Sequence, residues 1–214
     1  MKLWNLKYWE TGEYQVIQEH LDDYTKAKTM ICPQRKDIFK ALRETPYESL
    51  RVAIFGQDPY PNPAHATGLA FSVPAELRRS DWPPTLNNVV KEYMDDLHYP
   101  EPATGSLLPW AHRGVLLWNV IPTCIAFRSL SHQEWPEYHE LNKEMLERIA
   151  DKPEVVCVFL GGIARAYIPF CKNDYLAYSH PSPRANLSSK TPFLGSRMFT
   201  NVNDKLKETI DWRL

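Results

Sequence analysis

A carboxylate lies in a proline-containing turn directly after a short apolar, β-branched run. The run is Val52–Phe55, and Gly56-Gln57-Asp58-Pro59-Tyr60-Pro61 follows it. In open parallel sheets, ligands bind outside the carboxyl ends of the strands, so Asp58 is a candidate catalytic group. The same residues also fit a simple turn in which Asp58 caps its own backbone. The hexapeptide alone leaves both interpretations open.

Polar or flexible residues also follow three other strand-like runs. Asn119 follows Val115–Trp118, Gly161-Gly162 follows Val155–Leu160, and Ser179-His180 follows Tyr175–Tyr178. Each has a structural explanation by itself: a turn cap, a helix start, or a structural histidine. Together they predict a pocket at one sheet edge that combines a carboxylate, an amide and an imidazole.

The elements that must position these groups alternate between strands and helices. Helical patterns over Pro84–Leu97 and Pro136–Ala150 separate the strand-like runs, which predicts an α/β fold with a parallel sheet covered on both sides. The first 50 residues are expected to be mostly helical, and Leu69–Val73 is expected to form a short extended piece. No repeat or linker interrupts the sequence, so residues 1–214 are expected to form one domain.

Composition limits the possible partners. Of the 214 residues 43% are hydrophobic and 24% are charged, and the formal net charge is −1. No global positive field indicates nucleic acid, although local basic loops are compatible with this balance. The sequence has no apolar run of signal-peptide or membrane-spanning length. We therefore expect a soluble, cytoplasmic protein without a membrane partner.

The cysteines do not form a metal-binding pattern. Cys32, Cys124, Cys157 and Cys171 include no Cys-x-x-Cys pair, and Cys157 lies inside an apolar run. Four thiolates would suffice in number for a metal or iron–sulfur site, but their spacings match no common zinc or iron–sulfur pattern. We expect buried free thiols in a reducing compartment, with no metal and no cofactor.

Four ordered segments resemble the signature motifs of family 1 uracil-DNA glycosylases. They are residues 56–60, 68–73, 114–119 and 180–183. Weaker similarity extends over Pro33–Arg43, Trp82–Leu86, Phe193–Gly195 and Ile210–Trp212. The resemblance implies a three-layer α/β sandwich with a central four-stranded parallel sheet flanked by helices. It also implies hydrolysis of the N-glycosidic bond of deoxyuridine in DNA, which releases uracil and leaves an abasic site.

The resemblance assigns the chemistry to two residues, Asp58 and His180. A glycosidic bond breaks through an oxocarbenium-like sugar while negative charge grows on the departing base. Asp58 would supply the anion beneath the sugar and orient the attacking water. His180, as a neutral imidazole, would donate to uracil O2 together with the backbone N–H of Gln57.

Base selection is implied at four residues: Gln57, Tyr60, Phe71 and Asn119. The Asn119 amide can donate to O4 and accept from N3–H of uracil, an arrangement that cytosine does not match. Tyr60 would exclude the methyl group of thymine, and Phe71 would stack on the uracil ring. Outside the motif context, both aromatic residues would be read as ordinary core residues.

DNA contact is implied for loops at the same edge, with Pro84, Thr85, Gly162, Ser182 and Arg184 as the candidate residues. Backbone N–H groups and small hydroxyls bind phosphate without much net charge. The expected partners are single- and double-stranded DNA containing uracil, whose target base is flipped out of the stack. A DNA-mimicking protein inhibitor is a further possible partner, and a monomer is expected.

The chain departs from the usual bacterial pattern at several positions. Pro61-Asn62-Pro63 replaces His-Gly-Pro, and Arg184 stands where a leucine usually fills the gap left by the flipped base. Gly162 replaces a common serine, and the stretch 185–192 is longer than usual. These differences predict an active enzyme with altered DNA engagement, in which Arg184 is a cationic plug.

Two alternatives remain. One is the mismatch or thymine glycosylase branch of the same superfamily, which Tyr60 and Asp58 disfavour. The other is a DNA-binding or replication-accessory protein that retains the glycosylase fold. Asp58, Asn119 and His180 argue against a purely binding role but are compatible with a second one.

Overall fold

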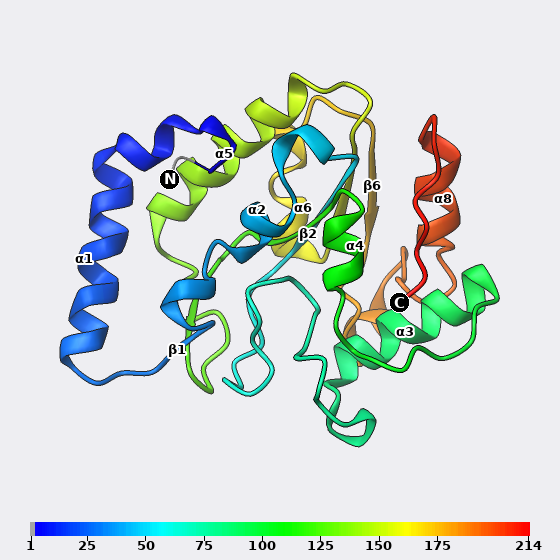
Figure 1. Ribbon diagram of the computed structural model, residues 1–214, viewed down its shortest axis with the longest axis horizontal. Helices are drawn as coiled ribbons and strands as arrows, with labels where there is room; N and C mark the ends of the chain where they lie inside the picture. Colours follow the sequence, from blue (N-terminus) through cyan, green and yellow to red (C-terminus); the bar gives the residue numbers. More distant parts are fainter. Residues whose placement is uncertain (1–2) are drawn as a thin grey trace.

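The centre of the molecule is a four-stranded parallel sheet (Figure 1). The computed structural model describes residues 3–214. The strands are β2 (Val52–Gly56), β3 (Val115–Asn119), β5 (Val156–Leu160) and β6 (Tyr175–Tyr178), in the order β3-β2-β5-β6. The predicted four-stranded parallel sheet is therefore confirmed.

Register aligns the carboxyl ends of the strands. Gly56 pairs with Asn119 across β2 and β3, and Leu160 pairs with Tyr178 across β5 and β6. Every residue of β2, β3 and β5 is buried, because helices cover both faces of the sheet. The residues that follow each strand therefore emerge at one edge.

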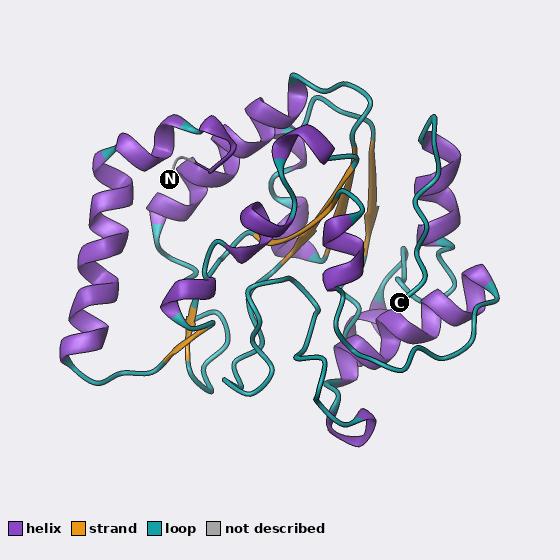
Figure 2. Cartoon of the chain, in the orientation of Figure 1, coloured by secondary structure: helices purple, strands orange, loops and turns teal. Residues whose placement is uncertain are grey.

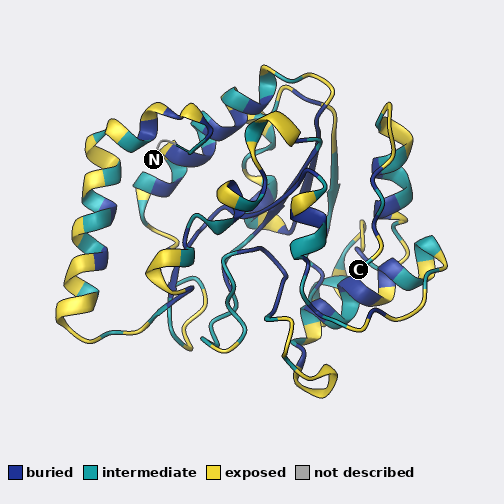
Figure 3. Cartoon of the chain, viewed as in Figure 1, coloured by how far each residue is buried: buried dark blue, intermediate teal, exposed yellow. Residues whose placement is uncertain are grey.

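Helices form the outer two layers (Figure 2). On one side α1 (Gly12–Lys26) packs on α5 (Pro136–Ala150). On the other side lie α3 (Pro84–Leu97), α4 (Leu108–His112) and α8 (Met198–Lys205). Figure 3 shows that buried residues gather on the sheet and on the inward faces of these helices.

Aromatic side chains hold the second helical layer together. The Trp110 ring of α4 lies 5.4 Å from Phe199 of α8 and 5.3 Å from Trp212 near the C-terminus. The Trp110 indole N–H also donates to the Trp212 carbonyl at 2.7 Å, which satisfies a buried donor. This cluster fixes α4 and α8 beside the sheet.

Shorter elements complete the chain. They are α2 (Lys40–Glu44), α6 (Gly162–Arg165), α7 (Pro183–Ser188), and the 3₁₀ segments Leu3–Asn5, Lys7–Glu10, Arg35–Asp37, Tyr47–Ser49, Arg79–Asp81 and Ile168–Phe170. The strands β1 (Ile31–Cys32) and β4 (Cys124–Ile125) form a small antiparallel pair. The prediction that the N-terminal 50 residues are mostly helical is thus confirmed, with β1 as an unexpected strand.

Predicted boundaries agree closely with the observed ones, with one exception. The two predicted long helices match α3 and α5, and each main strand agrees within one residue. The expected extended piece at Leu69–Val73 is wrong, because this segment forms turns. Phe71 adopts a φ of 66°, outside the extended region, and the Ser72 N–H bonds back to the Leu69 carbonyl.

Two further predictions concern the cysteines and the membrane. All four cysteines are free thiols, and only Cys171 is partly exposed. Within residues 3–214 no helix has the length and apolar character required to cross a membrane.

Candidate active site

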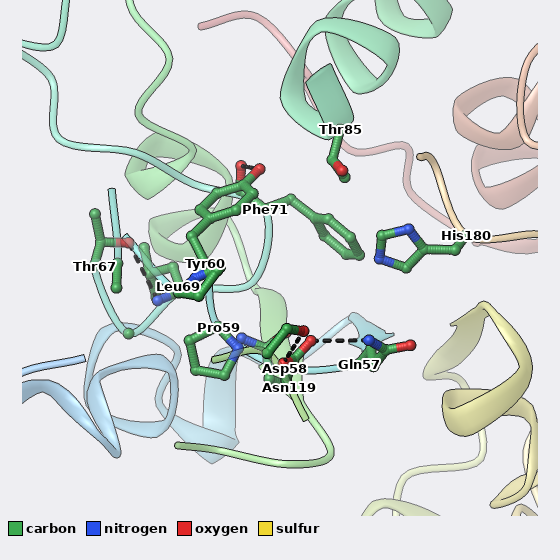
Figure 4. Close-up of a pocket in the computed structure, with 14 residues that line it drawn as sticks. Gln57, Asp58, Pro59, Tyr60, Thr67, Leu69, Phe71, Thr85, Asn119 and His180 are labelled. Atoms are coloured by element: carbon green, nitrogen blue, oxygen red, sulfur yellow. Dashed lines mark hydrogen bonds between the residues drawn. The ribbon is translucent and has the colours of Figure 1, made fainter. Parts of the chain in front are cut away.

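A cavity of about 150 Å³ opens at the carboxyl ends of β2 and β3 (Figure 4). It contains all six residues predicted to act in catalysis or uracil binding, and of the predicted DNA-contact residues it contains one. Its lining consists of Gln57, Asp58, Pro59, Tyr60, Pro61, Ala66, Thr67, Gly68, Leu69, Phe71, Thr85, Asn119, Ser129 and His180. The strand ends therefore meet as the sequence predicts.

Three hydrogen bonds hold the Asp58 carboxylate. Gln57 Nε2 donates to Oδ1 at 2.9 Å, Ser129 Oγ donates to Oδ2 at 2.6 Å, and the Leu130 N–H donates to Oδ2 at 2.7 Å. Three donors from two segments of the chain fix the direction of the carboxylate. Asp58 is therefore oriented within the cavity rather than a residue that caps its own backbone.

The His180 imidazole is oriented so that one nitrogen is free to donate. The Ser182 N–H donates to Nδ1 at 3.1 Å, so the proton of the neutral ring belongs on Nε2. Burial lowers the pKa of His180 below its usual value, against a smaller raising effect of the Asp58 charge. Asn88 of α3 donates to the Pro181 carbonyl at 2.6 Å and thereby anchors the loop that carries this ring.

Asn119 presents an uncommitted amide. Among residues 3–214, no hydrogen bond of its side chain is formed with another residue, although only 9% of the residue is exposed. Gly56 makes room for it, because a Cβ at position 56 would lie 2.8 Å from Asn119 Oδ1 and 2.9 Å from Phe71 Cζ. The end of β2 thus needs a glycine for the cavity to exist.

Tyr60 and Phe71 are linked across the cavity wall. The Tyr60 hydroxyl donates to the Phe71 carbonyl at 2.9 Å, and burial raises the pKa of Tyr60, which keeps the phenol neutral. The Phe71 ring lies 5.9 Å from the His180 ring at an angle of 52°. Figure 4 shows these two rings next to each other in the cavity.

The predicted DNA-contact residues lie outside the cavity, except Thr85. Pro84 is exposed at the first position of α3, Gly162 is exposed at the start of α6, and Ser182 is the N-cap of α7. Arg184 is exposed on α7. All four lie at the starts of helices, where backbone N–H groups are commonly free, although Pro84 has no N–H and the Ser182 N–H is bonded to His180 Nδ1.

The sequence did not predict two features of the site: the loop residues that bond Asp58, and an exposed leucine on α7. Ser129 and Leu130 reach Asp58 from 71 and 72 residues away, in a loop without a recognised motif. Leu187 on α7 is 90% exposed, which is unusual for a leucine. Its position in the lengthened stretch 185–192 was the only signal that could have indicated it.

Comparison with known proteins agrees with this geometry. The family model of the uracil DNA glycosylase superfamily matches residues 42–207. A protein of Coxiella burnetii named uracil-DNA glycosylase is 39% identical over 209 residues, covering 94% of this chain and 88% of that protein. A protein of the same name from Lacticaseibacillus casei is 36% identical over 212 residues, covering 96% and 90%.

Solved structures show the same fold. The crystal structure of mimivirus uracil-DNA glycosylase superposes with a TM-score of 0.83 at 22% identity, covering 96% of this chain and 83% of that one. A mimivirus UNG variant in complex with UGI superposes with a TM-score of 0.86 at 23% identity, covering 97% and 86%. The chain belongs to the uracil-DNA glycosylase superfamily.

Proposed function

We propose that this protein is a DNA repair enzyme, a family 1 uracil-DNA glycosylase that hydrolyses the N-glycosidic bond of deoxyuridine in DNA. The observation that carries the proposal is the meeting of Asp58, Asn119 and His180 in one cavity of a chain whose relatives bear that name. The products are free uracil and an abasic site.

Asp58 and His180 act on opposite ends of the breaking bond. The Asp58 carboxylate stabilises the positive charge that develops on the sugar and orients the water that attacks it. His180 donates from Nε2 to uracil O2, where negative charge accumulates. A neutral histidine suits this role because its lowered pKa keeps one acceptor and one donor nitrogen in place at neutral pH.

The cavity walls select the base. The free amide of Asn119 complements O4 and N3–H of uracil, and a mismatched amide would penalise cytosine. Tyr60, fixed by its bond to the Phe71 carbonyl, blocks the position of a C5 methyl group. The Phe71 ring supplies a stacking surface, and the backbone N–H of Gln57 donates to the base.

The DNA strand is engaged by the segments around the cavity mouth. At the helix starts, Thr85 and Ser182 offer hydroxyl groups and Gly162 a backbone N–H to phosphate, Pro84 contacts the strand without a donor, and Arg184 adds a positive charge. This small number of charged contacts agrees with a formal net charge of −1. The target base must leave the stack to reach the cavity.

A substrate panel tests the proposed reaction. Oligonucleotides with one uracil, thymine or cytosine, in single and double strands, are incubated with the protein, and the released base and the abasic site are quantified. We expect release of uracil alone. Thymine release from mismatches would instead assign the chain to the mismatch branch, and binding without release of any base would assign a purely accessory role.

We further propose a single-domain monomer in the bacterial or host-cell cytoplasm. The packing of α1 on α5 joins the helical N-terminal part to the rest, and the bacterial relatives support the location. The mimivirus UNG structures with UGI support sensitivity to a proteinaceous inhibitor.

A further inference from the structure

The loop that follows β4 reaches across the sheet edge to Asp58. Its Ser129 hydroxyl and Leu130 N–H both donate to Oδ2, at 2.6 and 2.7 Å. We propose that Ser129 is a positioning residue that directs Asp58 toward the hydrolytic water, an inference that rests on the proposed function. Pro61 has no N–H and no polar side-chain atom, so it cannot donate a hydrogen bond that holds the Asp58 turn. In this chain Ser129 supplies that hydrogen bond.

Hydrogen-bond capacity assigns a separate task to each oxygen of Asp58. A carboxylate oxygen has about two acceptor positions. Oδ2 has both positions filled, by Ser129 and Leu130, whereas Oδ1 accepts only from Gln57 Nε2 at 2.9 Å. Oδ1 therefore retains a free position, and it is the oxygen that accepts a hydrogen bond from the attacking water.

Hydrogen bonds and two uncommon backbone conformations fix the loop that carries Ser129 next to Asp58. The Phe127 N–H donates to the Pro61 carbonyl at 2.7 Å, which ties the loop to the Asp58 turn, and the Ile125 N–H donates to Ser131 Oγ at 2.7 Å. Phe127 and Leu130 have φ values of 63° and 61°, which are uncommon for bulky residues. Such conformations persist only where neighbouring contacts enforce them, and they cluster at functional sites.

A buried hydrogen-bond network anchors the two ends of the same loop. Thr123 Oγ1 bonds to His132 Nδ1 at 2.8 Å and to the Tyr138 hydroxyl at 2.6 Å, and all three residues are buried. This network fixes both ends of the segment that carries Ser129. Ser129 itself is exposed, so a change of its side chain removes a hydrogen bond without leaving a hole in the core.

Three variants test the inference. Ser129→Ala removes the donor, Ser129→Thr retains it on an exposed site, and Ser49→Ala is the control, because Ser49 is an exposed serine before the amino end of β2 whose hydroxyl bonds only the nearby Pro46 carbonyl. In steady-state and single-turnover uracil excision, we expect Ser129→Ala to lower kcat by about 10- to 100-fold with little change in KM. Ser129→Thr should recover most of the rate, and Ser49→Ala should match the unmodified protein.

A crystal structure of Ser129→Ala supplies a readout independent of activity. We expect Asp58 to occupy more than one rotamer there, and a single rotamer in Ser49→Ala. An unchanged kcat, or a loss confined to KM, would overturn the positioning role, as would an unmoved Asp58 in the crystal. Absence of uracil release from the unmodified protein would instead reject the proposed function, and the Asp58 rotamer would still decide the positioning role.

Discussion

Gly56→Ala should close the base cavity while leaving the fold intact. Gly56 ends β2 directly beneath Asn119 and Phe71, and its φ is not positive, so alanine suits the backbone. The new Cβ would lie 2.8 Å from Asn119 Oδ1 and 2.9 Å from Phe71 Cζ, whereas ordinary contacts are 3.4–4 Å. Both walls would have to retreat by about half an ångström, on the scale of overpacking in a dense interior.

Gly56→Ala should reduce the stability of the protein only moderately but its rate of uracil excision strongly. Overpacking of this kind destabilises a protein by about 1–3 kcal/mol, or roughly 2–4 °C of Tm per kcal/mol at this chain length. A displacement of groups that hold the reacting base costs about 100-fold in rate. Uracil excision should therefore fall by about two orders of magnitude while the melting transition stays cooperative.

The assay pairs excision from a single-uracil oligonucleotide with inhibition by free uracil and a thermal melt. Gly12→Ala is the control, since a Cβ there meets nothing within 4 Å and Gly12 lies on α1, away from the cavity. A folded Gly56→Ala variant with normal excision and normal inhibition by uracil would refute the claim that Asn119 and Phe71 form the walls of the base site.

Three further predictions concern selectivity, DNA engagement and pH. Tyr60→Ala should permit thymine release that Tyr60→Phe does not, measured on a thymine-containing strand; no thymine release from Tyr60→Ala would remove Tyr60 from base selection. Leu187 is 90% exposed in the free protein, and we expect it to insert into the gap that the flipped base leaves in a duplex, where the leucine would be buried. Leu187→Ala should therefore weaken excision from duplexes by about 10- to 100-fold, with an unchanged melt and little effect on single strands; equal rates for Leu187→Ala and the unmodified protein on both substrates would exclude Leu187 as a wedge and leave that role to Arg184. Burial lowers the pKa of His132 to about 4. As the pH falls, His132 is therefore protonated near pH 6.5 in the unfolded chain but only near pH 4 in the folded protein. The free energy of unfolding should fall by about 3 kcal/mol as the pH drops from 6.5 to 4. His132→Asn should flatten this dependence in chemical denaturation, and an equally steep loss in the variant would show that other groups cause it.

The sheet and its long helices were predictable because their signals are local. Apolar runs mark the three fully buried strands, β2, β3 and β5, and prolines at the first helical position mark the starts of α3 and α5. The error at Leu69–Val73 has a different origin. The left-handed φ of Phe71 is imposed by tertiary contacts, and a phenylalanine gives no sign of it in the sequence.

The candidate site was predictable only in part. Asp58, Asn119 and His180 could be placed because each lies at or within two residues of the carboxyl end of a strand, and parallel strands end at one edge. Ser129 could not be placed, because a serine in a loop carries no periodic signal and its partner lies 71 residues away. The need for Gly56 also emerges only when the positions of Asn119 and Phe71 are known.

The most direct test of the central claim is uracil release by Asp58→Asn and His180→Ala, compared with the unmodified protein on one single-uracil oligonucleotide. We predict that the unmodified protein frees uracil and leaves an intact abasic strand, and that each substitution lowers the single-turnover rate by about 100- to 1000-fold. Retention of near-normal turnover by either folded variant would contradict the assignment of Asp58 and His180 as the groups that carry the reaction.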